Sequence, residues 1–519
     1  MPDAYDRIEN IGDGPNRVNP TPPLWLGLLA LYCLVKLWFV AGVDLGKDEA
    51  VYWYWGQHLD ASYALLPFAA LKLAHFLHPG HEWFLRLGWI CSGAFSIVLL
   101  YRLCRLYHLD CTASLWACIA FATSHWIWHN TSYLHPDAFL VCCWLLTLVW
   151  ARQAADDPAP SSFIKVGVTA GLTCLCKYSA AFLVLGLFLW ILVGGPGRTR
   201  WAALGYALLP CLLVATPLIY AQFSTAFYLP TTLSTLSRIV ELQSPPMRLL
   251  LFLLNPLLFV SPLLLWLLYR AGIRVGLDLR RRLAEDQLLV FLPALCLLLG
   301  FAFFALFRGQ IKGNWILPAF LGLWPLAFSR PCLPANARGF LVLLLATALL
   351  YTLPIAFGLK YPGLATWLGN KKLDATYTAL VAQPDQAREQ SFSWTERLCE
   401  YSGWEVWATQ LDTSLAQKGF SPAVPLLSAQ YNIVFPLAYY GNPQRHYFTV
   451  ADPRFYNLTD FANQAGPVYP RDVLYAGRSG SSLPPSLQAL YPSSQLVAVL
   501  PRADKGCPPV NYQIFLLRQ

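Results

Sequence analysis

Charged residues are scarce in this sequence. Asp, Glu, Lys and Arg make up 13% of its 519 residues, and hydrophobic residues make up 56%. A soluble domain carries about 25% charged residues. The deficit excludes an ordinary soluble protein and is typical of a polytopic membrane protein, because a charge at bilayer depth costs about 2.5–3.5 kcal/mol.

Motifs for common cofactors and for cleavage are also missing. The sequence has no GxGxxG after a strand, no P-loop, no GxSxG and no zinc-type CxxC, so it offers nothing for a soluble nucleotide or nicotinamide cofactor. We expect no nucleic-acid partner. The first 22 residues are polar and partly acidic, unlike a signal peptide, so we expect the segment after them to be a retained first helix.

Long apolar runs are what the sequence does contain. Runs of about 17–25 residues are long enough to span a bilayer. Eleven candidates follow, of which 162–176 and 178–194 form a short pair that meets at Lys177-Tyr178: 24–43, 84–104, 112–129, 136–151, 162–176, 178–194, 201–221, 248–269, 287–307, 314–329 and 338–358. The fold class predicted is an α-helical polytopic membrane protein.

Positive charge fixes the expected orientation. Loops rich in Arg and Lys stay cytoplasmic, and a cytoplasmic N-terminus places most arginines inside: Arg102, Arg105, Arg152, Arg198, Arg200, Arg270, Arg274, Arg280, Arg281, Arg282, Arg330 and Arg338. We therefore expect a cytoplasmic tail (1–22), a transmembrane catalytic domain (23–358) with a large external loop (44–83), and an external C-terminal domain (359–519). The apolar run 63–77 in that loop is short and predicts a helix lying in the interface.

The C-terminal region has a different composition. Short β-like runs begin at Pro425, Tyr447, Asp472, Gln495 and Gln513, and a helical pattern covers 403–415, which indicates a small soluble α/β domain. Twelve of the 14 cysteines lie in or next to apolar segments, where Cys behaves as a small apolar residue. Only Cys399 and Cys507 lie here, and either one disulfide or two free thiols fits them.

Two carboxylate positions could carry chemistry. Asp48 and Glu49 are adjacent at the end of the first span, and Asp137 follows His135-Pro136 at the external start of another. One of the pair could serve as a general base at the membrane surface. The alternative makes Asp48 and Asp137 helix N-caps, where the macrodipole stabilises an acid.

Cations and histidines gather on the same external side. Lys177, Arg308 and Lys312 could hold an anionic headgroup or a leaving phosphate, or could snorkel to the interface. His78, His81 and Glu82 are weak candidates for a divalent metal, since Pro79-Gly80 breaks the helix between them. Tyr52 and Trp53 could stack on a sugar or anchor the interface.

Four motifs together resemble a known family. They are Asp48-Glu49-Ala-Val-Tyr52-Trp53-Tyr-Trp, His135-Pro-Asp137-Ala, Cys176-Lys177-Tyr178-Ser-Ala and Lys312-Gly-Asn314-Trp315. In this order they resemble the bacterial polytopic glycosyltransferases of the GT-C fold, in the branch that transfers aminoarabinose and galacturonic acid to lipopolysaccharide, which is related to the protein O-mannosyltransferases. The similarity extends to residues 429–440.

The resemblance implies a polyprenyl-phosphate-linked sugar donor and a lipid or glycolipid acceptor at the outer face of the bacterial inner membrane. It assigns the catalytic carboxylates to Asp48 and Asp137. Substrate binding is assigned to Glu49, Tyr52, Trp53, His135, Lys177, Tyr178, Arg308, Lys312 and Trp315. No cofactor is required, a divalent metal remains an option, and we expect a monomer with a periplasmic C-terminal domain.

One stretch departs from the family pattern. Where the family has Asp-His-Pro-Pro, the corresponding stretch here reads Tyr63-Ala64-Leu65-Leu66-Pro67, so the acid and the histidine are lost and one proline remains. A non-catalytic polysaccharide-assembly subunit therefore stays open as an alternative. A transporter or flippase is another, although few charges besides Lys36 lie at bilayer depth, where that class usually carries them.

Overall fold

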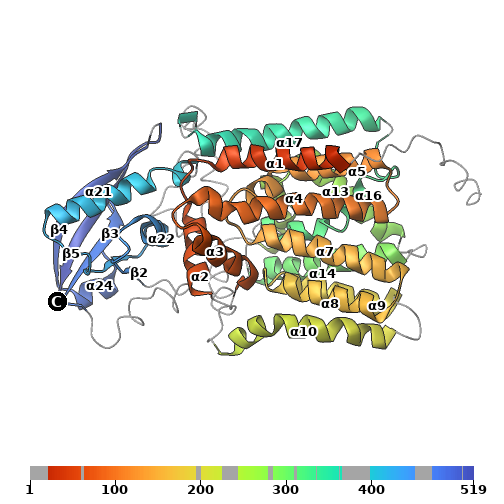
Figure 1. Cartoon of the computed structure of the whole chain (residues 1–519), viewed down its shortest axis with the longest axis horizontal. Coiled ribbons are helices and arrows are strands. Elements are labelled where there is room, and N and C mark those ends of the chain that lie inside the picture. Colours follow the sequence, from red (N-terminus) through yellow and green to blue (C-terminus); the bar gives the residue numbers. More distant parts are fainter. Residues whose placement is uncertain are drawn as a thin grey trace, which may run out of the picture.

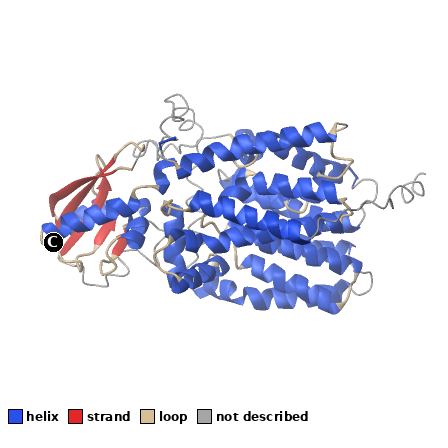
Figure 2. Cartoon of the chain, turned by 45° about the horizontal axis from the view of Figure 1, so that its top comes forward, coloured by secondary structure: helices blue, strands red, loops and turns tan. Residues whose placement is uncertain are grey.

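The protein is a helical bundle joined to a small mixed sheet domain (Figures 1 and 2). The computed structural model describes residues 22–59, 63–194, 200–224, 244–278, 285–308, 313–334, 336–361, 363–364, 398–450, 470–504 and 506–519. Most bundle helices run side by side, and α2 and α3 lie across the end of the bundle that faces the sheet domain (Figure 1). The large first loop therefore stands between the two parts.

The helices of the bundle follow the apolar runs of the sequence. They are α1 (Pro22–Val40), α2 (Lys47–His58), α3 (Leu65–Leu77), α4 (Glu82–Leu106), α5 (Cys111–Thr123), α6 (His125–Asn130), α7 (Asp137–Asp156), α8 (Pro160–Cys174), α9 (Ala180–Gly194), α10 (Arg200–Ser224), α12 (Pro245–Leu254), η3 (Asn255–Leu258), α13 (Pro262–Asp278), α14 (Glu285–Arg308), α15 (Gly313–Ile316), η5 (Leu317–Phe320), α16 (Trp324–Ala327) and α17 (Ala337–Lys360).

The bundle belongs to a multi-pass membrane protein. Within the described part of the chain, five helices are long and apolar enough to span a membrane, in α4, α7, α10, α14 and α17, and shorter apolar helices stand among them. Large apolar side chains on the outside of these helices are exposed, with Leu350 at 74% and Leu213 at 64%. Exposed apolar surface of this kind indicates contact with lipid.

Three of the predicted spans are not continuous helices. The span 248–269 is divided into α12, η3 and α13, and 314–329 into α15, η5 and α16. Proline is the reason at both places, because Pro256, Pro262, Pro318 and Pro325 remove backbone donors and clash with the preceding turn. The span 112–129 breaks at Ser124, whose ψ of 137° is extended.

The C-terminal domain has the five strands that the sequence predicted. They are β1 (Leu426–Ser428), β2 (Tyr447–Thr449), β3 (Asp472–Arg478), β4 (Ser493–Arg502) and β5 (Val510–Arg518), in the order β2-β1-β3-β5-β4. β1 pairs in parallel with β2 and β3, whereas β5 pairs antiparallel with β3 and β4. Helices α21 (Trp404–Gln417) and α22 (Tyr431–Tyr440) pack on one face, and α24 (Pro485–Leu490) packs on the other.

A disulfide closes the C-terminal region on itself, and polar contacts fix this region to the first loop. Cys399 and Cys507 are bonded across 108 residues, so the disulfide alternative is confirmed. Lys47 pairs with Glu400 at 3.3 Å, and the Asp44 carboxylate accepts a hydrogen bond of 2.7 Å from the backbone N–H of Trp404 at the start of α21. The C-terminal domain thereby holds the start of α2 and the segment before it.

Candidate active site

Adjacent residues Asp48 and Glu49 point to different surroundings. Both lie in the first turn of α2, whose N-cap is Gly46 and not Asp48. The N-cap interpretation of Asp48 is therefore wrong. Successive residues of a helix are about 100° apart around its axis, so one carboxylate can be buried while its neighbour is not. Glu49 is 2% exposed, and Asp48 is exposed.

Glu49 forms a saturated ion pair with Arg86 of α4. The carboxylate oxygens lie 2.9 Å from Nε and 2.6 Å from Nη2 of Arg86. They also accept hydrogen bonds from the backbone N–H groups of Leu134, at 2.7 Å, and Gly46, at 3.0 Å. This carboxylate has no exposed surface to offer a ligand, and its predicted role in substrate binding does not fit its position.

Arg86 uses all five of its N–H donors in the same place. Besides the two bonds to Glu49, Nη1 donates to the carbonyl groups of Val40 and Val43, and Nη2 donates to that of Asp44. The side chain is fully buried. Arg86 therefore ties the end of α1 to the start of α2.

The carboxylate of Asp137, at the first residue of α7, forms a second buried ion pair. Its Oδ1 lies 2.6 Å from Nζ of Lys177, in the turn between α8 and α9. Asp137 is fully buried and Lys177 is 8% exposed. The N-cap of α7 is Pro136, without a side-chain cap, so Asp137 serves as a partner of Lys177 and not as a cap.

Two amides that the sequence argument did not single out hold the other oxygen. Asn130 and Asn314 donate to Oδ2 of Asp137 over long distances of 3.5 and 3.4 Å. Asn314 reaches this place because Gly313 lies against the backbone of Asn255, where a Cβ atom would approach the Asn255 carbonyl oxygen to 2.4 Å. The signal was present in the motif that contains Lys312-Gly-Asn314, but the motif alone did not show which side chain faces Asp137.

His135 lies beside the Asp137–Lys177 pair, and its Nδ1 atom faces Asp137. The backbone N–H of Asp137 donates to Nδ1 at 3.2 Å, so Nδ1 is an acceptor, and the neutral ring carries its proton on Nε2. Nδ1 also lies 3.6 Å from Asp137 Oδ2. The ring of Tyr52 lies 5.9 Å from that of His135, which places Tyr52 in the same site.

Tyr63 connects the two carboxylate positions. Burial raises its pKa, and the charges of Asp137 and Asp48 raise it further, so this phenol lies within electrostatic reach of both. Its ring is 5.7 Å from that of Tyr178, whose hydroxyl accepts a hydrogen bond of 3.0 Å from Gln222. The aromatic residues around Asp48 and Asp137 thus form one continuous group.

The remaining predicted site residues either pack against other aromatic side chains or lie outside the residues that the structure describes. Trp53 packs against His75 and Tyr439, away from Asp137. Trp315 packs against Phe301, with 5.9 Å between ring centroids. Arg308 is the last residue of α14, and its side chain lies outside the described part of the structure, as does Lys312. Their predicted phosphate-binding roles stay predictions.

The weak metal candidates do not converge. The rings of His78 and His81 are 4.5 Å apart, but the Glu82 carboxylate accepts a hydrogen bond of 3.0 Å from Tyr440. Among the described residues, no group of three His, Cys, Asp or Glu side chains is arranged to hold a metal ion. Whether the protein uses a divalent metal stays a prediction.

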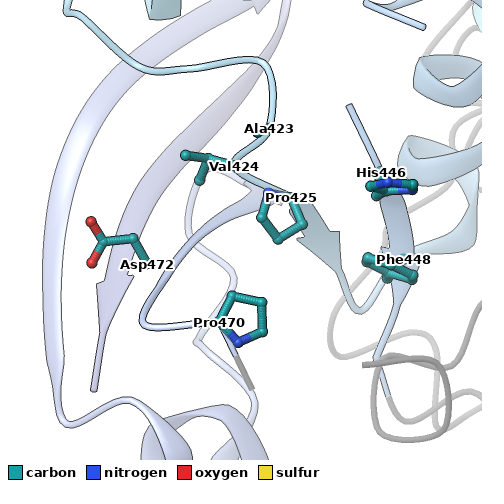
Figure 3. A pocket seen from close by; sticks show the side chains of 7 residues that line it. All are labelled: Ala423, Val424, Pro425, His446, Phe448, Pro470 and Asp472. Atoms are coloured by element: carbon teal, nitrogen blue, oxygen red, sulfur yellow. The ribbon is translucent and has the colours of Figure 1, made fainter. Parts of the chain in front are cut away.

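A pocket of about 310 Å³ lies elsewhere, in the C-terminal domain (Figure 3). Figure 3 shows Pro425 and Pro470 between His446 and Phe448 on one side and Asp472 on the other. Asp472 lies 3.6 Å from Arg518. None of the carboxylates or cations of the bundle lines this pocket, so it does not belong to the site described above.

The fold and one family model agree with the expected resemblance. The model of dolichyl-phosphate-mannose-protein mannosyltransferase matches residues 62–224. The structure of ArnT from Cupriavidus metallidurans in the apo state aligns with a TM-score of 0.59 and 16% identity, over 95% of this chain and 97% of that one. The structure of the same protein bound to undecaprenyl phosphate aligns with a TM-score of 0.60 and 16% identity, over 94% and 98%.

AglB from Archaeoglobus fulgidus, in complex with an inhibitory peptide and a dolichol-phosphate, aligns less well. Its TM-score is 0.46 at 13% identity, over 83% of this chain and 64% of that one. No functionally curated protein matches the chain in sequence. The near-complete alignment with ArnT shows that the two chains share one fold, and the resemblance to GT-C glycosyltransferases is confirmed at that level.

Proposed function

We propose that this protein is an integral membrane glycosyltransferase that moves a sugar from a polyprenyl phosphate to an acceptor hydroxyl. The observation that carries the proposal is that an ArnT-like bundle holds both an exposed carboxylate, Asp48, and a buried Asp137–Lys177 ion pair. The structure of ArnT with undecaprenyl phosphate supports a lipid-linked donor.

Asp48 acts as the general base in the proposed reaction. It removes the proton of the acceptor hydroxyl, whose oxygen then forms a bond to the anomeric carbon. The bond between that carbon and the phosphate oxygen breaks, and the polyprenyl phosphate leaves with the electron pair. A single displacement of this kind inverts the anomeric centre. Asp48 suits the role because it is exposed, whereas Glu49 is enclosed.

Lys177 is proposed to stabilise the departing phosphate. Its ammonium group is oriented by Asp137 at 2.6 Å, and a fixed cation at the leaving group lowers the barrier without reorganising. Arg308 and Lys312 are proposed to add positive charge at the same phosphate. With these cations a monophosphate can leave without a metal.

We place the reaction at the outer face of the bacterial inner membrane. The Cys399–Cys507 disulfide supports this side for the C-terminal domain, because disulfides persist in oxidising compartments. The excess of Arg in the opposite loops supports the same orientation. A polyprenyl carrier suits this location, since it brings both substrates into one plane.

Purified protein in proteoliposomes tests the proposal. The probes are undecaprenyl phosphates carrying a labelled aminopentose, hexuronic acid or hexose, with a Gram-negative total lipid extract as acceptor, and release of undecaprenyl phosphate is measured. Asp48→Asn should lower turnover by about 100-fold or more, the usual contribution of a general base. Asp110→Asn is the control, since Asp110 caps α5 through Ala113 N–H at 2.8 Å and Asn caps equally well.

The outcomes separate the proposed class from its alternatives. Asp48→Asn with wild-type turnover would show that Asp48 is not the base. If the wild type releases no undecaprenyl phosphate from any of the three donors, the result would favour the non-catalytic assembly subunit. The loss of the Asp-His element is the observation that suggests this alternative. Movement of the donor across the bilayer without its cleavage would favour a flippase.

A further inference from the structure

Helix α22 of the C-terminal domain is buried on two sides. Ile433, Val434 and Leu437 belong to the core that α22 shares with α21 and the sheet. Phe435, which has no exposed surface, belongs instead to the core around α2 and α3. One helix therefore serves two hydrophobic cores, and its position is determined by both.

The side that faces α2 is a line of aromatic residues four positions apart. Residues at that spacing lie on the same face of a helix. The Tyr439 ring lies 4.9 Å from Trp53, and the Phe435 ring lies 5.3 Å from Tyr54. Continuing the line by one turn brings Tyr431 to the start of α2, where its hydroxyl donates a hydrogen bond of 3.3 Å to Asp48 Oδ1.

The other end of α22 is fastened to the segment before α2. The Tyr440 hydroxyl accepts from the backbone N–H of Leu45 at 2.7 Å and donates to the Glu82 carboxylate at 3.0 Å. Phe435 lies between Tyr431 and Tyr440 in α22 and packs in the core around α2 and α3. Neither end of α22 can therefore shift independently of α2. The Tyr431 hydroxyl is therefore presented to Asp48 by a rigid element.

We infer that Tyr431 is a positioning residue for Asp48, so that the C-terminal domain supplies part of the site and is not a separate accessory. This inference rests on the proposed function, in which Asp48 is the base. Tyr431 donates to one oxygen and fixes the rotation of the carboxylate, which determines where the acceptor proton is received. Nothing in the motifs around Asp48 indicates a partner that lies 383 residues away in the sequence.

The substitution Tyr431→Phe removes the hydroxyl and keeps the ring. A hydrogen bond to a charged group is typically strong enough that its loss should lower kcat by about 10-fold, while the KM for the labelled undecaprenyl-phosphate sugar stays within about 2-fold. Tyr439→Phe is the matched control on the same face of α22. The buried Tyr439 hydroxyl has no hydrogen-bond partner among the described residues, so this variant should turn over like the wild type.

Combining the substitution with Asp48→Asn tests the mechanism of the effect. A positioning residue has nothing to position once the base is gone, so Tyr431→Phe should cost little further activity in the Asp48→Asn background. A merely structural tyrosine would lower activity by the same factor in both backgrounds. Thermal unfolding of each variant, followed by tryptophan fluorescence, should show no loss of stability beyond that of Tyr439→Phe.

Each outcome has a definite meaning. A 10-fold loss in kcat that vanishes in the Asp48→Asn background supports the inference. Wild-type kcat in Tyr431→Phe, or an equal loss in both backgrounds, overturns it while the proposed function stands. An absence of transfer by the wild type overturns both, and this result is visible before any variant is made.

Discussion

The two buried ion pairs, Glu49–Arg86 and Asp137–Lys177, look alike in burial but differ in how fully their polar groups are used. Every N–H of Arg86 is bonded, and both oxygens of Glu49 accept a backbone N–H in addition to the guanidinium. In the other pair, Oδ2 of Asp137 has only two long contacts to amides. Within the described residues, Lys177 Nζ has one hydrogen-bond acceptor.

The difference teaches how to separate structural charge from functional charge. A saturated pair holds its surroundings in one arrangement and has no capacity left for a ligand. A pair with weakly held oxygens and spare ammonium donors can accept a new partner without breaking its first one. Burial alone does not distinguish the two cases, whereas counting the bonds of each atom does.

The largest effect is expected from breaking the saturated pair. Arg86→Met leaves the Glu49 charge buried without its partner, which should lower the free energy of unfolding by about 3–5 kcal/mol. Thermal unfolding in detergent measures this loss. Adding Glu49→Gln removes the second charge and should recover part of it. A melting temperature for Arg86→Met equal to that of the wild type would contradict the structural role.

A smaller effect on stability, with a large effect on activity, is expected at the second pair. Replacing both partners, as Asp137→Asn with Lys177→Met, leaves no unpaired charge, so stability should change by about 1 kcal/mol or less. Release of undecaprenyl phosphate should nevertheless fall by about 100-fold, because the cation at the leaving group is lost. Retained turnover in this double variant would remove Lys177 from the mechanism.

The smallest effect concerns Asp44, a carboxylate held by backbone N–H groups. Burial raises its pKa to about 6, against hydrogen bonds from Trp404 and Glu405 that lower it, and the charges of Glu82 and Glu405 add to the rise. The folded protein thus keeps a proton that the unfolded chain releases near its ordinary pKa of 3.8. Stability from this group is therefore fully present below about pH 4 and is lost as pH rises to about 6.

Asp44→Asn checks this sign. The variant does not ionise, so it should be more stable than the wild type at pH 7.5, by about 1–2 kcal/mol, and the difference should vanish near pH 4. Melting temperatures of both proteins across this range provide the measurement, and other titrating groups cancel in the difference. A difference that grows toward low pH would show that the carboxylate is stabilising when ionised.

Much of the fold followed from patterns along the chain. The apolar runs predicted most of the helices, and alternation with turn residues predicted all five strands of the sheet. The pattern failed where proline interrupts an apolar run, as at Pro256 and Pro318, because hydropathy reports burial and not the backbone hydrogen bonds that a helix needs. The Asp48, Asp137 and Lys177 positions were also chosen from the sequence.

What the sequence could not supply was the partner of each polar group. Asn314 lies in a motif and Tyr431 in the similar stretch 429–440, but neither pattern names a partner, and Asn130 lies in no motif. Each of the three meets Asp137 or Asp48 only because a distant segment brings it there. In the sequence, Arg86 and Lys177 are both single cations in or next to apolar runs. Their contacts gave them different roles.

The sequence by itself determined that this is a multi-pass membrane chain with a small α/β domain and a pair of adjacent carboxylates after its first helix, because these depend on composition and local periodicity. Only the tertiary structure decided which carboxylate of that pair is enclosed. Neighbouring residues on a helix face different directions, and Glu49 faces inward because Arg86, 37 residues away, closes over it. Asp48 is left to face Tyr431, and that choice cannot be made from the order of the residues alone.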